Sequence, residues 1–274
     1  MADLGILGWT EGGRRFREGS SGGRWPAAAS GTSGAAAALE EAWRGLRPAD
    51  VVEKVDLLDF VSRLQRKVYV QGYMKLVEHA PELWGMVFKK TDNPKLLRRV
   101  ARFRRGFAER TNQKFVRHLR AFRPDAVVCT HYLPVEIMAY LERKAFNPFT
   151  VCVVTDFEAH VLWMEQAVDL YCVAAEETKG SLVARGASPE DVVVTGIPIG
   201  TKFSSCPDGK AVRKKYGLRD DVPVLLVLGG GFGMGPVGRI LGALDRVERA
   251  GQVLVVAGRN EKLRRDLEIG RAHV

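Results

Sequence analysis

Six short apolar runs alternate with helix-like segments between residues 125 and 258, and this rhythm restricts the possible folds more than any other feature of the sequence. Each run is continuously apolar, which is typical of strands whose two faces are both covered. Such strands alternating with helices predict an α/β fold with a doubly wound parallel sheet, present twice along the chain. The expected strands cover residues 125–131, 150–157, 170–177, 192–198, 224–231 and 252–258.

The part of the chain before residue 125 is mainly helical in pattern. The spacing of apolar residues predicts a helix that begins at Ala35 and closes before Pro48, followed by a strand over residues 51–60. A largely helical segment then runs over residues 64–119. Residues 1–34 are rich in Gly, Ser and Arg and have no periodicity, so we expect them to be disordered or non-native.

Length and composition indicate two lobes. With 274 residues and 46% hydrophobic residues, the chain is long and apolar enough to bury more than one core. The seam is expected between Gly196 and Pro223, where the pattern breaks. We therefore expect a first lobe over residues 35–200 and the start of a second lobe over residues 201–267.

The positive charge of the chain is concentrated in one window. The net charge is +10, but residues 63–123 alone hold 17 Lys and Arg against 4 Asp and Glu. A basic face of this kind indicates an anionic partner. No stretch approaches the roughly 20 apolar residues of a spanning helix, so we expect any membrane contact to be peripheral. Four scattered cysteines without metal-ligand spacing indicate core thiols in a reducing cytoplasm.

Within this basic window, one helix-like stretch has an apolar stripe and a basic face. Such a helix can lie on a membrane, with its stripe at the acyl boundary and its charges on anionic headgroups. The alternative is a helix of the lobe whose stripe faces the core and whose arginines are solvated. No nucleic-acid-binding motif accompanies the charge, so we expect no nucleic acid partner. The residues expected at the membrane are Arg98, Arg99, Arg102, Phe103 and Arg105.

A run of glycines stands between a predicted strand and a predicted helix. Backbone N–H groups of such a loop can approach a phosphate closely, because no Cβ atoms intervene. The acidic residue that marks a dinucleotide site about 20 positions later is absent, so a nucleotide diphosphate fits better than NAD. The alternative is a tight turn that binds nothing. The expected binding residues are Gly229, Gly230, Gly231, Phe232, Gly233 and Gly235.

Polar side chains follow two of the predicted strands at the point where each strand ends. The carboxyl ends of parallel strands meet at one edge of a sheet, which is where ligands bind in α/β folds. A histidine at this edge can take a proton from a hydroxyl near neutral pH, although a structural, hydrogen-bonded histidine is the alternative. Ligand spacing for zinc is missing, so we expect no metal or other cofactor. The residues are Thr130, His131, Thr155, Asp156, His160 and Trp163.

Several segments together resemble the family of monogalactosyldiacylglycerol synthases and processive diacylglycerol glycosyltransferases, which is glycosyltransferase family 28. The resemblance covers about residues 35–267 and is denser than any single glycine loop. The segments that carry it are DVVEKVDLLDFVS, APELWGMVFKKTD, RPDAVVCTHYLPVEIMAYL, VVTDFEAHVLWMEQAVDLYCVAAEETKGSLVARGASPEDVVVTGIPI and GGGFGMGPV.

This resemblance implies a GT-B fold whose first lobe binds diacylglycerol at the membrane and whose second lobe binds a UDP-sugar. It places His131, Asp156 and His160 on the wall of the cleft between the lobes as catalytic residues. Trp163 would lie near the lipid side, and residues 229–235 would hold the diphosphate. The implied reaction transfers glucose or galactose from the UDP-sugar to the diacylglycerol hydroxyl, with inversion to a β-glycoside and without a metal.

The chain departs from the family at both ends. The family's first strand ends in a Gly-x-Gly-His turn, whose histidine is a candidate base, but Gly31-Thr32-Ser33-Gly34 stands here and the first histidine is His79. A one-base displacement turns codons for Gly-His-Val-Arg into codons for Gly-Thr-Ser-Gly, so we expect residues 1–34 to be frameshifted. Residues 268–274 match a translated sequencing adapter and are expected to be artefactual. We therefore expect a truncated second lobe and an inactive chain.

Two other functions are consistent with the sequence. The sugar acceptor could be an undecaprenyl-linked or other lipid intermediate, since a more distant resemblance exists to the lipid-linked N-acetylglucosamine transferase of peptidoglycan synthesis. The chain could also be a non-catalytic module that docks on anionic membranes through residues 63–123. The sequence does not distinguish glucose from galactose, and it gives neither the number of sugars added nor the oligomeric state.

Overall fold

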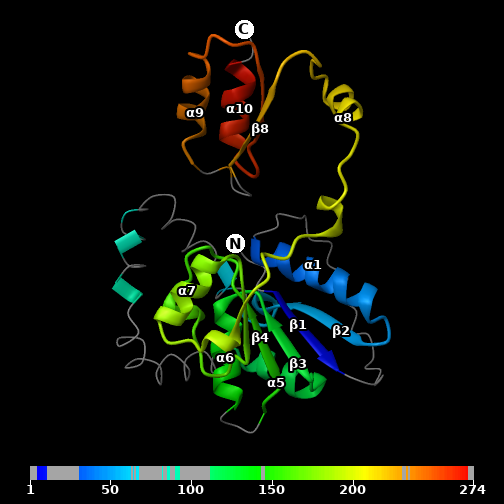
Figure 1. Ribbon diagram of the computed structural model, residues 1–274, viewed down its shortest axis with the longest axis vertical. Coiled ribbons are helices and arrows are strands. Elements are labelled where there is room, and N and C mark those ends of the chain that lie inside the picture. Colours follow the sequence, from blue (N-terminus) through cyan, green and yellow to red (C-terminus); the bar gives the residue numbers. More distant parts are fainter. Residues whose placement is uncertain are drawn as a thin grey trace. The chain divides into compact units, whose positions relative to one another are not determined.

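A computed structural model describes residues 5–10, 31–62, 64, 66–67, 82, 85–86, 90–92, 112–142, 146–229, 233 and 235–270 of the protein. Contacts between residues divide the chain into two compact units, of which the first ends at Lys202 and the second continues from Phe203. Each unit has its own sheet (Figure 1).

The first unit is built on a six-stranded sheet with the strand order β2-β1-β3-β4-β5-β6. Neighbouring strands from β3 to β6 are parallel, so the predicted parallel α/β sheet is confirmed over this part. The polar residues predicted at the ends of β3 to β6 leave the ladder, so these four strands end earlier than expected. The strands are β1 Gly5–Thr10, β2 Val51–Asp56, β3 Ala126–Cys129, β4 Phe149–Val153, β5 Leu170–Val173 and β6 Val192–Val194.

The strand β1 lies between β2 and β3 and runs antiparallel to both. It departs from the expected parallel order, and it falls within residues 1–34, which are expected to be disordered or non-native. Because β2 and β3 point the same way and stand one strand apart, a single inserted strand pairs the backbone groups of both. The run GILGWT forms this inserted strand, β1, which pairs with both neighbours in the antiparallel direction.

Helices lie on both faces of this sheet (Figure 1). The helix α1 contacts β1 and β2, and its buried alanines allow the close approach. On the other face, α5, α6 and α7 contribute buried residues to one core. Val55 of β2 packs against this core, whereas Val52 of β2 lies outside it. The helices are α1 Gly31–Leu46, α5 Gln113–Phe122, α6 Tyr132–Glu142 and α7 Glu176–Ala184, with 3-10 helices at Leu57–Asp59, Val161–Trp163, Pro189–Asp191 and Thr201–Phe203.

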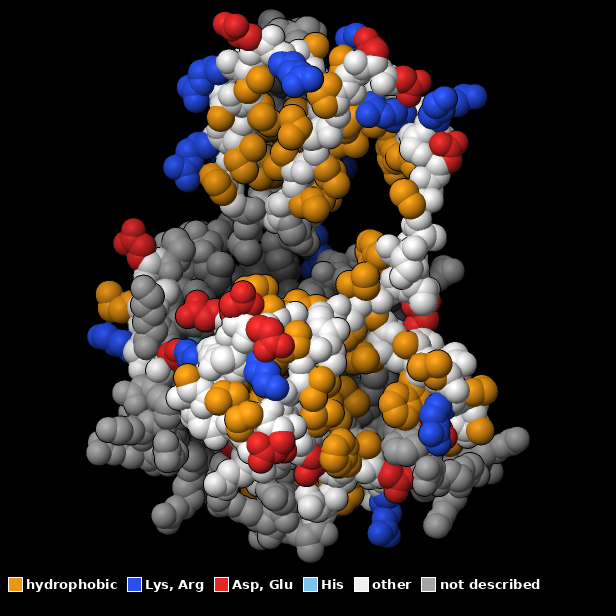
Figure 2. Space-filling model, in the orientation of Figure 1, with side chains coloured by type: hydrophobic (Ala, Val, Ile, Leu, Met, Phe, Trp, Pro, Cys, Tyr) orange, Lys and Arg blue, Asp and Glu red, His pale blue; other side chains and the backbone are white. Residues whose placement is uncertain are grey.

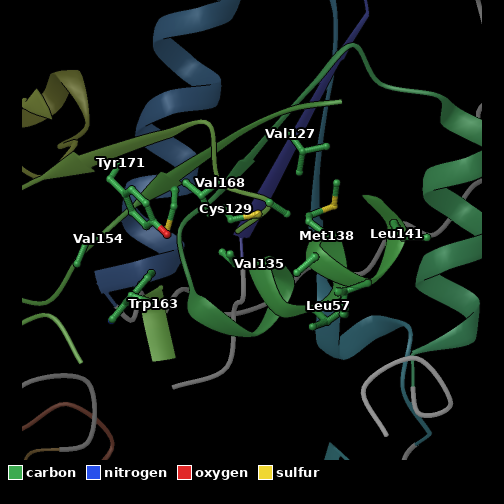
Figure 3. Close-up of a cluster of buried hydrophobic side chains, with 14 of the residues drawn as sticks. Leu57, Val127, Cys129, Val135, Met138, Leu141, Val154, Trp163, Val168 and Tyr171 are labelled. Atoms are coloured by element: carbon green, nitrogen blue, oxygen red, sulfur yellow. The ribbon is translucent and has the colours of Figure 1, made fainter. Parts of the chain in front are cut away.

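The core of the first unit is formed around α6, which is buried along almost its whole length. Val135, Met138 and Leu141 of this helix belong to the same buried cluster as Val127 and Cys129 of β3 and Tyr171 of β5 (Figure 3). Trp163 enters the same core from the segment that follows β4. Helices that are apolar on every side occur inside proteins, so α6 acts as the central element of this layer.

Two of the cysteines belong to this core. Cys129 and Cys152 are paired in register on β3 and β4, and both are fully buried. Burial raises the pKa of the Cys129 thiol to about 12 and raises that of Cys152 as well. The prediction of core thiols is confirmed for these two residues, whereas Cys172 is half-buried and Cys206, which lies outside the apolar runs, is exposed.

The described part of the second unit contains two parallel strands and three helices, in the order α8 Gly209–Tyr216, β7 Val224–Leu228, α9 Val237–Leu244, β8 Gln252–Val256 and α10 Glu261–Gly270. The sequence analysis does not predict α8, because this helix buries no residue and so has no apolar stripe. Its end signals were nevertheless present. Asp208 caps the first turn by accepting from the Lys210 N–H, and Gly217 ends the helix with φ +66°.

The strand β7 is more exposed than predicted. Leu225, Leu226 and Leu228 are 47%, 58% and 66% exposed, so the expectation of a strand covered on both faces is wrong here. In the described part of this unit the sheet has two strands. Figure 2 shows hydrophobic side chains gathered on the surface of this unit.

Replacing Leu141 by Ala is expected to lower the free energy of unfolding by about 2–5 kcal/mol, because a fully buried side chain leaves a cavity in a packed core. The measurement is urea unfolding followed by circular dichroism. Leu46→Ala is the matched control, since Leu46 is 82% exposed and its loss should change the free energy by less than about 0.5 kcal/mol. Equal effects of the two substitutions would contradict the assignment of the core to α6.

Candidate active site at the carboxyl edge of the first sheet

Two neighbouring strands of the first sheet bring their polar carboxyl ends together. β3 and β4 are parallel and in register, with Cys129 opposite Cys152. The residues that follow both strands therefore lie at one edge, as predicted. Thr130 and His131 lead from β3 into α6, and Thr155 to Trp163 form the segment after β4.

His131 is held at the start of α6 by its own ring. The side chain is 6% exposed, and Nδ1 accepts the N–H of Leu133, the second residue of the helix, at 3.1 Å. The ring centroid lies 4.2 Å from that of Tyr132 and 6.1 Å from that of Trp163. Burial lowers the pKa of His131 to about 3, so the imidazole is neutral at physiological pH.

His160 repeats this local arrangement after β4. It precedes the 3-10 helix Val161–Trp163, and its Nδ1 accepts the N–H of Leu162 at 3.1 Å. Its Nε2 lies 3.4 Å from Oγ1 of Thr91. Since both ring nitrogens contact groups of the protein, the structure gives His160 a role in anchoring this segment. Its catalytic role stays a prediction.

Trp163 joins the two strand ends. Its indole Nε1–H donates to Oδ2 of Asp156 at 2.9 Å, and its ring packs edge-on against Tyr132 with centroids 6.1 Å apart. The side chain is 1% exposed, and its predicted place near the lipid side stays a prediction. A buried indole finds its partner inside the protein, and here that partner is Asp156. Asp156 is itself exposed.

Asp92 ties this edge to a distant part of the chain, and the sequence analysis did not identify it. One carboxylate oxygen accepts the N–H of Val161 at 2.9 Å, and the other accepts from Arg185, the residue that follows α7, at 2.7 Å. Burial opposes ionisation, but the hydrogen bonds and charge of Arg185, the Val161 N–H and the charge of His160 lower the pKa of Asp92 below its usual value. No local pattern signals a contact across 93 residues.

The glycine loop of the second unit is described at three of its predicted residues, Gly229, Gly233 and Gly235. Gly233 has φ +58°, and a Cβ atom there would lie 2.1 Å from the carbonyl oxygen of Ala257. Asn260 donates to the Gly233 carbonyl at 3.1 Å and accepts the N–H of Leu263 in the first turn of α10. This position therefore requires glycine and is fixed to the turn after β8.

The remaining predicted residues lie outside the described part of the chain. These are Gly230, Gly231 and Phe232 of the loop, and Arg98, Arg99, Arg102, Phe103 and Arg105 of the basic window. Within the described residues, no His, Cys, Asp and Glu side chains form a group that could hold a metal ion. Among the same residues, no helix combines the length and the apolar character needed to cross a bilayer.

Comparison with known proteins identifies the family. A model of monogalactosyldiacylglycerol (MGDG) synthase matches residues 33–199, which include both strand ends described above. The chain belongs to the MGDG synthase family. The family predicted from the sequence segments is therefore confirmed.

Members of the MGDG synthase family from plants and bacteria are similar to this chain. A probable MGDG synthase 2 of Oryza sativa is 30% identical over 218 residues, which cover 74% of this chain and 45% of that protein. A processive diacylglycerol beta-glucosyltransferase of Bacillus pumilus is 31% identical over 156 residues, covering 57% and 40%. The chain thus spans less than half the length of these curated relatives. Among solved structures, the apo form of the lipopolysaccharide outer core galactosyltransferase WaaB aligns with a TM-score of 0.38 and 18% sequence identity. The alignment covers 58% of this chain and 44% of WaaB, and its TM-score is too low to support an argument about the fold.

Replacing Asp92 by Ala is expected to lower the free energy of unfolding at pH 7 by about 1–3 kcal/mol, because Arg185 and the Val161 N–H lose their acceptor. The folded pKa of Asp92 lies below 3.8, so this stability is present above pH 3.8 and is lost as the pH falls through the folded value. Denaturant unfolding of the parent protein and of Asp92→Ala between pH 2.5 and 7 measures how the difference between their free energies of unfolding narrows. Asp221→Ala, which breaks an exposed ion pair with Arg219, should leave stability unchanged. A difference that does not narrow as the pH falls below 3.8 would rule out the ionised contact.

Gly233→Ala is expected to destabilise the second unit by several kcal/mol, since the added Cβ meets the Ala257 carbonyl and φ is positive. Gly238→Ala is the matched control, because Gly238 lies in α9 with open space around it and alanine favours the helix by about 0.5–1 kcal/mol. Thermal unfolding of both variants gives the comparison. Similar melting temperatures would show that Gly233 is not held as described.

Proposed function

We propose that the protein acts in glycolipid biosynthesis and transfers a glucosyl or galactosyl group from a UDP-sugar to diacylglycerol. The observation that carries the proposal is the family match over residues 33–199, which contains the edge formed by His131, Asp156 and Trp163. The names of the relatives point to a galactosyl group in the plant proteins and a glucosyl group in the bacterial one, with diacylglycerol as the shared acceptor.

The transfer is a direct displacement. The hydroxyl oxygen of diacylglycerol attacks the anomeric carbon while the bond from that carbon to the UDP oxygen breaks, so the product is a β-glycoside of inverted configuration. Asp156 takes the hydroxyl proton, because it is the exposed member of the three predicted catalytic residues and Trp163 orients its carboxylate. Solvent then accepts the proton from Asp156.

The glycine loop receives the leaving diphosphate. Positive φ angles at Gly233 and Gly235 turn the backbone in a way that glycine alone adopts easily, and α9 begins directly after them. Backbone N–H groups and a helix N-terminus stabilise the negative charge that develops on departing UDP, so the reaction proceeds without a metal ion. No other cofactor takes part.

The protein works as a peripheral protein on the cytoplasmic face of the membrane. The support is the excess of Lys and Arg over residues 63–123, since anionic headgroups attract basic segments by about 1 kcal/mol per residue near the surface. Arg98, Arg99, Arg102, Phe103 and Arg105 would make this contact. Diacylglycerol is confined to the bilayer, so an enzyme that uses it has to work at that surface.

A chimaera tests the proposed reaction. Residues 33–199 replace the corresponding segment of the Bacillus pumilus glucosyltransferase, and the purified chimaera is incubated with vesicles of diacylglycerol and anionic phospholipid plus UDP-glucose or UDP-galactose. We expect a glycosyl diacylglycerol from at least one donor. Asp156→Asn in the chimaera should lower kcat about 10²–10⁴-fold, because the amide still accepts the Trp163 N–H but cannot take a proton.

The unchanged Bacillus pumilus protein is the positive control, and circular dichroism with size-exclusion chromatography shows whether the chimaera is folded. A folded chimaera that makes no glycolipid with either donor, while the control does, would reject the proposal. Glycosylation of an undecaprenyl-linked acceptor in preference to diacylglycerol would move the function to the other lipid class. Vesicle binding that weakens with added salt, without any sugar transfer, would indicate that the protein is a membrane-docking module.

A further inference from the structure

His131 has one ring nitrogen whose hydrogen is unused. Nδ1 accepts the N–H of Leu133, so Nδ1 carries no hydrogen. In a neutral imidazole the hydrogen is then on Nε2, which makes Nε2 a donor. Within the part of the chain that the structure describes, Nε2 has no hydrogen-bond partner.

The side chain of His131 is 6% exposed. Nε2 is not one of the described buried side-chain atoms that lack a partner, so this donor lies on the part of the ring that solvent or a ligand can reach. An oxygen ligand can therefore accept from Nε2 while the rest of the ring stays buried. The position of His131 at the carboxyl edge of β3 is where the fold presents such ligands.

The helix behind the ring strengthens this donor. α6 is 11 residues long and its first turn carries partial positive charge. The Leu133 N–H passes this polarity to Nδ1, and hydrogen bonds in series reinforce each other. Pro134, the next residue, has no N–H to offer. Nε2–H is therefore polarised by the positive end of α6 through the Leu133 contact.

The same geometry removes His131 from the role of base. A base needs a lone pair directed at the proton it takes. The lone pair of Nδ1 is engaged by Leu133, and Nε2 holds a hydrogen. Turning the ring over would break the Leu133 contact.

We propose that His131 is a hydrogen-bond donor to a substrate oxygen that carries or develops negative charge during glycosyl transfer. The inference rests on the proposed function, and it assigns a binding role to a residue that the sequence analysis took for a proton acceptor. Two oxygens have this chemistry, the acceptor hydroxyl as it loses its proton and the diphosphate of the donor.

The tautomer can be measured without any substrate. The titratable groups on the elements around the ring are Cys129 of β3, Cys152 of β4, Tyr132, Glu136, Tyr140 and Glu142 of α6, and Asp156, Glu158 and His160 between β4 and Val161. Long-range ¹H–¹⁵N spectra of the ¹⁵N-histidine-labelled chain, assigned with His131→Ser, should show His131 with the hydrogen on Nε2 and no titration between pH 5 and 8. Burial, which holds the pKa near 3, predicts this constancy. A hydrogen on Nδ1, or proton uptake in this range, would overturn the inference whether or not transfer occurs.

Kinetics of the chimaera test the role in catalysis. The substitution His131→Ser keeps an oxygen that can cap α6, but it removes the Nε2–H donor. We therefore expect kcat/KM to fall about 10²–10³-fold. The acid side of the pH profile should keep its shape, because no base has been lost. His118→Ser is the matched control, since His118 lies on α5 and pairs with Glu53.

The two candidate oxygens give different kinetic results. A raised KM for diacylglycerol indicates the acceptor hydroxyl, and a raised KM for the UDP-sugar indicates the diphosphate. Unchanged kcat/KM, or loss of the acid limb in His131→Ser alone, would overturn the donor role. Failure of transfer in the parent chimaera would count against the proposed function and not against the measured tautomer.

Discussion

The burial of Trp163 between two strand ends is the interaction on which the rest of the first unit's polar edge depends. Its ring packs against His131 and Tyr132 at the start of α6, and its N–H reaches back to Asp156 after β4. A large aromatic side chain removed from water stabilises a structure more than any single hydrogen bond at this edge. The parallel register of β3 and β4 brings the two ends near each other, and the indole then fixes their distance.

Two polar groups with opposite surroundings result from this packing. Asp156 stands in solvent with its carboxylate oriented, whereas His131 is enclosed and neutral. Active sites commonly separate the tasks of neighbouring titratable groups in this way, because burial disfavours charge on one and water favours it on the other. Asp92, which lies within the basic window, holds the Val161 N–H and Arg185 through its two carboxylate oxygens.

The sequence predicted the parts of the fold that depend on continuous patterns. Apolar runs gave β3 to β6 and the helices between them, and dense family segments gave the MGDG synthase family. The helix α8 was not predicted because none of its residues is buried, although Asp208 and Gly217 marked its ends. In the site, residue types placed His131 and Asp156 correctly at one edge. The direction of Trp163, the tautomers of the histidines and the Asp92 contact depend on tertiary packing, which no spacing rule encodes.

The distribution of thiols has a practical consequence for studying this protein. Cys129 and Cys152 are enclosed between the sheet and α6, and burial keeps their thiols protonated, whereas Cys206 is exposed near the start of the second unit. Maleimide and methanethiosulfonate reagents attack thiolates that they can reach. A fluorophore or nitroxide can therefore be attached at Cys206 under native conditions while the β3–β4 pair stays unmodified, with half-buried Cys172 as the position to monitor by mass spectrometry.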